Sequence, residues 1–124
     1  MIQTKRLAKK IAHYLDFHKG ENVEIIDVED LTPITRFVIL VTASSSRQLN
    51  SFKDIALKIA EHYQVPIKNV EDKYNTPWVI VDLNDIVIHI MDNNSRAKYN
   101  LEGVYAKGKK VDYSDYKPTK KENF

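Results

Sequence analysis

Apolar residues recur at helical spacing in two long segments of the chain. Residues 2–19 place apolar side chains on one side and basic ones on the other, which predicts an amphipathic helix with Gly20 just past its C-terminal end. Residues 45–63 repeat this spacing. Ser45 with Gln48 three residues later predicts a capping box at the start of this second helix.

Short apolar runs between and after these helices predict strands. Residues 23–28 form one such run, and the near-continuous run at 37–41 is typical of a strand buried on both faces in an α/β sheet. Residues 67–71 suit a brief edge strand. Residues 92–101 suit a short helix capped by Asp92. Alternating helices and strands predict an α/β fold.

The stretch from Trp78 to Met91 predicts a β-hairpin that turns at Asn84 and Asp85, residue types that tolerate the positive φ of a tight turn. Folding the stretch about these residues places Trp78 opposite Met91. Since strand side chains alternate between faces, one face is wholly aliphatic: Val79, Val81, Leu83, Ile86, Ile88 and Ile90. The other, here called the mixed face, holds Trp78, Ile80, Asp82, Val87, His89 and Met91. The aliphatic face predicts core, and the mixed face requires a cover from this chain or from a partner.

Length and composition predict a single domain with a real core. The chain has 124 residues, 43% of them apolar and 29% charged. We expect residues 1–106 to form the α/β domain. Residues 107–124 lack periodicity and predict a polar, flexible C-terminal tail.

The charge balance argues against a protein dominated by phosphate contacts, because 19 basic and 17 acidic residues leave a net charge of only +2. The basic side of the first helix could bind RNA or a membrane surface, but such a charge run is more often a solvated face. The chain has no cysteine, no secretory h-region and no apolar run long enough to cross a bilayer. A cytoplasmic protein without a membrane partner is therefore expected.

Several carboxylates raise the alternative of an enzyme. Asp27 and Glu29 could hold magnesium in a nucleotidyltransferase-like enzyme, but such a site also needs a Gly-Ser pair, and none occurs. The three glycines form no phosphate-binding loop. His89 and Asp82 lie diagonally on the mixed face without a Ser or Cys nucleophile beside them. We therefore expect no catalytic residue, cofactor or metal.

Three segments resemble the ribosomal silencing factor family, also called the Iojap-related family: DVEDLTPITRFVILVTASSSRQ at 27–48, WVIVDLNDIVIHIM at 78–91 and SRAKYNLEGVY at 95–105. Around the hairpin, Trp78, Asp82, Asp85 and His89 match the family pattern. The departures are Leu83 for a tyrosine, Asn84 for a glycine, Met91 for an aromatic residue and Tyr105 for a tryptophan.

The resemblance implies a mixed sheet flanked by helices, similar in shape to nucleotidyltransferases but without their active site. It implies binding to the large ribosomal subunit through ribosomal protein L-fourteen, which blocks the small subunit and represses translation under nutrient limitation. A homodimer and a secondary contact with ribosomal RNA are further expectations, and a direct RNA-binding ribosome assembly factor is the other alternative. Arg47 and Arg96 also lie at positions that match the family. Each could hold a helix in place or contact the partner. The expected partner-binding residues are Trp78, Ile80, Asp82, Leu83, Asn84, Asp85, Val87, His89 and Met91.

Overall fold

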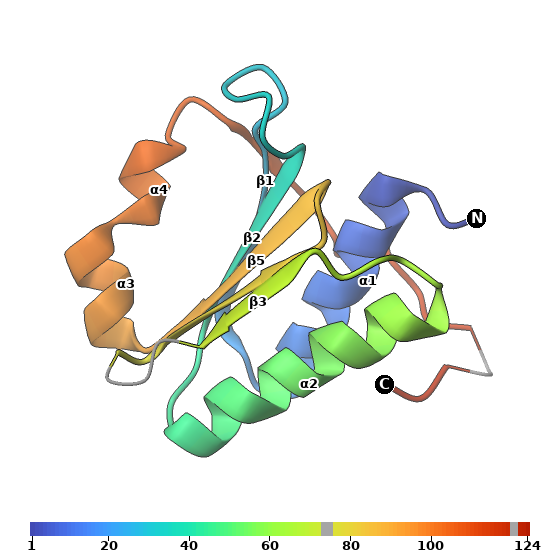
Figure 1. The fold of residues 1–124 in the computed structure, drawn as a ribbon, viewed down its shortest axis with the longest axis horizontal. Coiled ribbons are helices and arrows are strands. Elements are labelled where there is room, and N and C mark those ends of the chain that lie inside the picture. Colours follow the sequence, from blue (N-terminus) through green and yellow to red (C-terminus); the bar gives the residue numbers. More distant parts are fainter. Residues whose placement is uncertain (73–75, 120–121) are drawn as a thin grey trace.

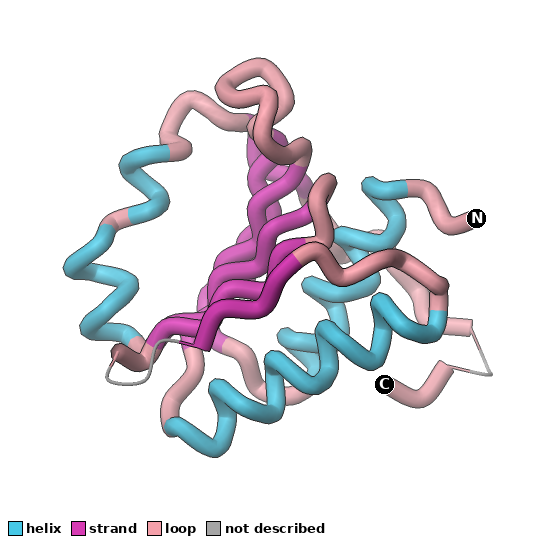
Figure 2. Tube along the Cα trace, in the orientation of Figure 1, coloured by secondary structure: helices cyan, strands magenta, loops and turns pink. Residues whose placement is uncertain are grey.

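The computed structural model describes residues 1–72, 76–119 and 122–124, and it arranges them in three layers (Figure 1). A β-sheet lies in the middle, with α1 and α2 on one face and α3 and α4 on the other (Figure 2). The elements in chain order are α1 (Thr4–Phe17), β1 (Glu21–Asp27), β2 (Phe37–Thr42), α2 (Ser46–His62), β3 (Asn69–Asp72), β4 (Trp78–Asp82), β5 (Ile86–Met91), α3 (Asn93–Tyr99), α4 (Leu101–Val104) and β6 (Lys109–Val111).

The sheet is mixed, as expected, and its strand order is β3-β4-β5-β2-β1-β6 in the described part of the chain. Strands β2 and β5 run parallel, and the other neighbours are antiparallel. All residues of β2 are buried, which confirms the prediction that the apolar run at 37–41 is a central strand. The prediction of an α/β fold is confirmed.

The hairpin of β4 and β5 has the predicted register, with Trp78 opposite Met91 and Asp82 opposite Val87. Its turn depends on Asn84, whose φ is 73°. Asparagine tolerates this left-handed conformation better than most residues. The backbone N–H of Asn84 also donates to Oδ1 of Asp82 over 2.8 Å, so a local side-chain contact fixes the turn.

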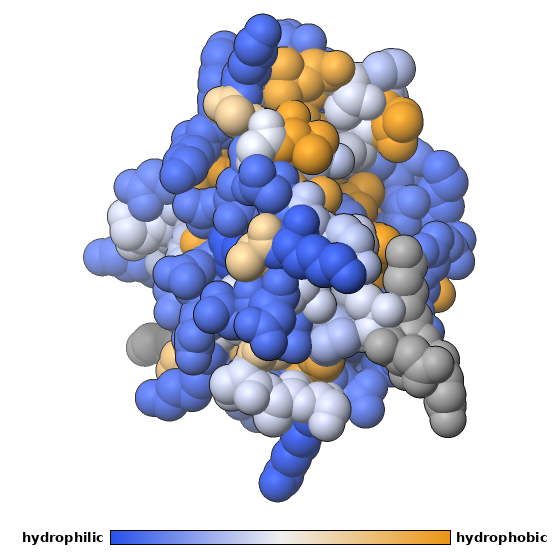
Figure 3. All heavy atoms as spheres, turned by 90° about the vertical axis from the view of Figure 1, so that its left-hand side faces the viewer, coloured by the Kyte–Doolittle hydropathy of each residue, from blue (hydrophilic) through white to orange (hydrophobic). Residues whose placement is uncertain are grey.

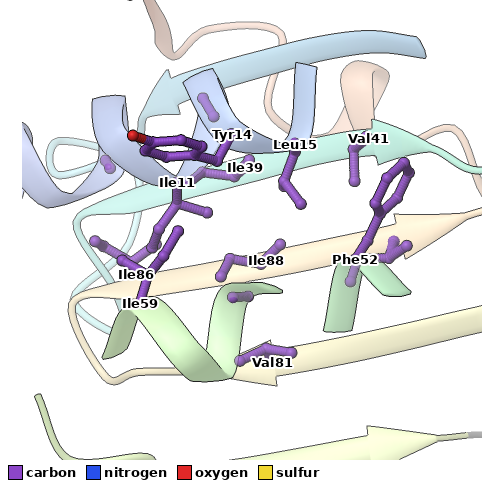
Figure 4. Close-up of a cluster of buried hydrophobic side chains, with 14 of the residues drawn as sticks. Ile11, Tyr14, Leu15, Ile39, Val41, Phe52, Ile59, Val81, Ile86 and Ile88 are labelled. Carbon is purple, nitrogen blue, oxygen red and sulfur yellow. The ribbon is translucent and has the colours of Figure 1, made fainter. Parts of the chain in front are cut away.

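The main core lies between the aliphatic face of the hairpin and the helices α1 and α2. Every residue predicted for that face is buried there. Figure 4 shows Ile11 and Leu15 of α1, and Phe52 and Ile59 of α2, packed toward sheet residues such as Ile88. Burying one such side chain contributes about 1.5–3 kcal/mol. This packing fixes the position of the sheet and leaves its opposite face for other contacts.

The helix termini differ in detail from the sequence pattern. Ser45 caps α2 as predicted, by accepting a 3.1 Å hydrogen bond from the N–H of Gln48. The Gln48 side chain, however, bonds to the N–H of Ser44 instead of Ser45. Beyond α1, Lys19 takes the positive φ of 76°, not Gly20. Glycine is needed at position 20 because the backbone there lies close to the end of α1. A Cβ on residue 20 would lie 2.7 Å from the Leu15 carbonyl oxygen.

The prediction of an unstructured tail is wrong for most of residues 107–124. Strand β6 pairs with β1, matching Val111 to Ile25. Tyr116 is buried in the main core, and Tyr113 and Phe124 pack against it. Three-residue strands and scattered tyrosines carry no periodic signal, so the sequence pattern did not reveal this packing. Residues 120–121 lie outside the described part.

The predicted short helix after the hairpin is two short helices. Asp92 caps α3 as expected, through a 2.8 Å bond from the N–H of Ser95. Asn100 then adopts a φ of 46°, which ends α3, and its side chain accepts from Gly103 N–H at the start of α4. No helix in the described ranges is long and apolar enough to span a membrane.

Candidate functional site

The helices α3 and α4 cover only part of the mixed face. Beneath them, Met91 is completely buried and joins a second, smaller core with Leu101 and Tyr105. The ring of Tyr99 lies 4.7 Å from that of Trp78, centroid to centroid. The chain itself therefore covers this end of the hairpin. A partner is not needed to cover the mixed face here.

The other end of the mixed face is open and forms a surface groove of about 460 Å³. Asp82 and Val87 lie in the groove, the loop between β1 and β2 forms one wall, and Val104 with Tyr105 forms another. Figure 3 looks onto this side of the molecule and shows hydrophobic side chains gathered near its top, above a largely hydrophilic surface. This groove is the candidate functional site.

The groove has an apolar rim that the sequence analysis did not identify. Leu31, Ile34 and Val104 are 41%, 73% and 65% exposed, and all three border the groove. Soluble proteins expose large aliphatic side chains in clusters mainly where a partner binds. Leu31 and Ile34 are the aliphatic residues of an otherwise polar loop at 29–36, and they were the signal available in the sequence.

The structure divides the predicted site residues into three groups, of which Trp78 and His89 are the last. Asp82 and Val87 lie in the groove, Ile80 is half-buried on the same face, and Asn84 and Asp85 are exposed at the turn. Leu83 and Met91, by contrast, are 4% and 0% exposed. The expectation that these two side chains face a partner is wrong, because Leu83 enters the main core and α4 covers Met91.

Trp78 and His89 bond to each other, between the groove and α3. The indole Nε1 of Trp78 donates to Nδ1 of His89 over 3.1 Å. His89 is 8% exposed, and burial lowers its pKa to about 4. His89 is therefore neutral at pH 7, and Tyr99 lies against the ring of Trp78.

Arg96 is a structural support for α3. Its guanidinium is buried and donates to Oγ1 of Thr42 over 3.0 Å and to Glu102 over 3.1 Å, and it lies 3.6 Å from a carboxylate oxygen of Glu24. These contacts join both short helices to the sheet. Arg47 is exposed at the start of α2. Of the two arginines expected as supports or contacts, Arg96 is a support.

The carboxylates that could have formed an enzyme site bond to neighbouring groups of the chain. Oδ1 of Asp27 accepts from the N–H of Glu29 over 3.0 Å, and Glu29 forms an ion pair with Arg36 at 3.5 Å. Asp82 bonds to the turn, and His89 bonds to Trp78. Among the residues that the structure describes, no group of three or more His, Cys, Asp or Glu side chains could hold a metal ion.

The fold and this groove define a small α/β protein with a mixed sheet and an apolar surface groove. Residues 2–124 match the family described as "Ribosomal silencing factor during starvation". The chain therefore belongs to the ribosomal silencing factor family, as the three sequence segments suggested.

Individual relatives agree with this assignment. A ribosomal silencing factor of Haemophilus influenzae is 30% identical over 100 residues, which covers 81% of this chain and 98% of that protein. One from Halalkalibacterium halodurans is 26% identical over 104 residues, or 84% and 89% of the two chains. A crystal structure of a protein from Chromobacterium violaceum has a TM-score of 0.80 at 25% identity, covering 91% of this chain and 93% of that one.

Proposed function

We propose that this protein binds the large ribosomal subunit through ribosomal protein L-fourteen and blocks association with the small subunit, which represses translation in the cytoplasm under nutrient limitation. The action is steric and requires no catalytic step. Membership of the ribosomal silencing factor family supports the proposal. The observation that carries the site assignment is the groove beside the hairpin, with its exposed Ile34 and Val104.

The chemistry of the groove suits a protein partner. Burying its aliphatic rim away from water is favourable. A protein contact of standard size buries about 800 Å² on each partner. Asp82 in the groove and Asp85 at the turn add negative charge beside that rim. Carboxylates at this place suit a basic protein surface and would repel the phosphates of RNA.

The size of the domain is sufficient for steric exclusion. A compact chain of 124 residues has a radius of gyration of about 14 Å. A body of this size at the joining surface of the large subunit prevents the close contact that subunit association needs. Occupancy of the site is then enough for repression.

A subunit-joining assay tests this proposal. Large subunits are incubated with the protein, small subunits are added, and joining is followed by light scattering, with co-sedimentation measuring binding in parallel. We expect the protein to sediment with large subunits and to reduce joining in proportion to occupancy. Binding without any reduction in joining would refute the steric mechanism. Equal binding to protein-free ribosomal RNA, with steep salt dependence, would favour the RNA-binding alternative.

A further inference from the structure

Glu122 places a carboxylate inside the protein, on the side of the sheet opposite to the groove. The side chain of Glu122 is 5% exposed and forms an ion pair with Lys10, whose side chain is 1% exposed. A fully buried lysine is rare in proteins because removing its charge from water is costly unless a partner compensates. This pair is therefore a specific feature of the fold and not a surface salt bridge.

Three tyrosines complete the surroundings of the carboxylate. The hydroxyl of Tyr14 in α1 donates to Oε2 of Glu122 over 2.9 Å, and that of Tyr116 lies 2.7 Å from the same oxygen. Tyr63, just beyond α2, donates to Oε1 over 3.4 Å. The Lys10 ammonium also lies 4.9 Å and 5.0 Å from the ring centroids of Tyr63 and Tyr116. One ammonium and three hydroxyls thus converge on one carboxylate.

Two elements that are distant in sequence supply most of these groups. Lys10 and Tyr14 come from α1, and Tyr63 follows the end of α2, so the donors remain in place whichever carboxylate they bind. Hydrogen bonds to ionised groups are about twice as strong as neutral ones, which favours an anion at this point. The cluster borders a surface hollow of about 600 Å³, through which a small anion can enter.

We propose that Lys10, Tyr14, Tyr63 and Tyr116 form a carboxylate-binding site, that Glu122 of the same chain occupies it, and that this occupancy holds residues 122–124 against α1 and the end of α2. The ligand class is an aliphatic carboxylate. The proposal is independent of the ribosomal function, because the site and the groove lie on opposite sides of the sheet.

Chemical rescue tests the site. Glu122→Ala removes a CH₂–COO⁻ group, which is the size of acetate. The full-length variant is melted in 0.3 M sodium acetate and in sodium chloride of equal ionic strength. We expect acetate to raise its Tm by about 3 °C more than it raises the Tm of the wild type, as binding at a few times Kd would do. Glu61→Ala, which removes an exposed carboxylate of α2, should respond like the wild type.

The double variant Lys10→Met/Glu122→Ala identifies the receptor. It should lose the extra acetate shift, because the ammonium that binds the anion is gone. An equal acetate shift in all four proteins would overturn the proposal. If Glu122→Ala does not fold, Glu122→Gln and Lys10→Met/Glu122→Gln give a second test. The second substitution should then recover part of the lost Tm, and a double variant no more stable than Glu122→Gln would contradict the paired site.

Discussion

The hydrogen bond from the indole of Trp78 to Nδ1 of His89 fixes the protonation state of a buried histidine. Indole is only a donor, so Nδ1 must accept over the 3.1 Å between the two nitrogens, and the ring proton resides on Nε2. These residues are diagonal neighbours in the hairpin, where Trp78 pairs with Met91 and His89 with Ile80, and Tyr99 of α3 lies against the indole ring. The pair connects the sheet to the helical cover beside the groove.

This relationship predicts a pH-dependent stability. Folded His89 has its pKa lowered to about 4 by burial, whereas the unfolded residue titrates near 6.5. Between these values the unfolded state binds more protons, so the free energy of unfolding should fall as pH falls from about 6.5 to 4, by about 3 kcal/mol at most. Above pH 6.5 His89 is neutral in both the folded and the unfolded state, so it no longer makes the free energy of unfolding depend on pH. Urea unfolding at a series of pH values measures it.

His89→Gln is the control for that titration, since glutamine can accept the indole hydrogen bond without titrating. The variant should lose most of the slope between pH 6.5 and 4. His13 keeps part of it, because burial lowers the pKa of that residue too. An unchanged pH profile in His89→Gln would show that another group controls acid stability.

Arg96 should be needed for the attachment of α3 and α4. Replacing it with methionine leaves the buried hydroxyl of Thr42 without its donor and removes two ion pairs. Because Glu24 and Glu102 remain partly exposed, we expect a loss of about 2 kcal/mol and not the full cost of breaking a buried pair. Arg47→Met, at an exposed position, should change stability by less than about 0.5 kcal/mol. Equal losses in both variants would contradict the supporting role of Arg96.

Gly108 tests whether the segment before β6 is a fixed part of the fold. A Cβ at this position would lie 2.4 Å from Cγ2 of Ile26 and 3.0 Å from the carbonyl oxygen of Asp27. Gly108→Ala should therefore destabilise the protein by about 1–3 kcal/mol. Gly103→Ala meets only the exposed side chain of Asn100 and should cost less. Thermal melts compare the two, and a neutral Gly108→Ala would mean that this segment does not pack as the structure shows.

The turn of the hairpin predicts a difference between two substitutions at Asn84. Its φ of 73° suits glycine but strains a β-branched side chain. Asn84→Gly should leave stability within about 0.5 kcal/mol, and Asn84→Val should cost about 1–2 kcal/mol. The same denaturation measurement serves for both. Equal stability of the two variants would contradict the left-handed turn.

Periodic features of the fold could be predicted from the sequence, and contacts without a period could not. The hairpin register followed from the turn at Asn84 and Asp85, and α2 followed from its apolar spacing and its cap at Ser45. The pairing of β6 with Ile25 involves only three residues separated by more than 80 positions, so no local pattern indicates it.

The same limit applies to the site. Alternation placed Met91 on the mixed face correctly, but only the tertiary position of Leu101 and Tyr105 shows that it is covered. Conversely, Ile34 belongs to no periodic segment, so its exposure beside the groove depends on how its loop packs. The sequence predicted which side chains share the mixed face, and only the structure shows that the chain itself covers part of that face.

The central claim is that the groove binds ribosomal protein L-fourteen, and exposed residues of its rim test it with the least effect on folding. Ile34→Ser and Val104→Ser remove side chains that are 73% and 65% exposed. Phe17→Ser is the matched control, because Phe17 is 66% exposed on α1, across the sheet from the groove. All three variants should keep the circular dichroism spectrum of the wild type.

The decisive measurement is the Kd of each variant for isolated ribosomal protein L-fourteen by isothermal titration calorimetry. A buried aliphatic contact at the rim contributes about 1–2 kcal/mol, so Ile34→Ser and Val104→Ser should each raise Kd about fivefold to thirtyfold. Phe17→Ser should bind like the wild type. Wild-type affinity in both rim variants, or an equal loss in Phe17→Ser, would contradict the assignment of the groove as the binding site.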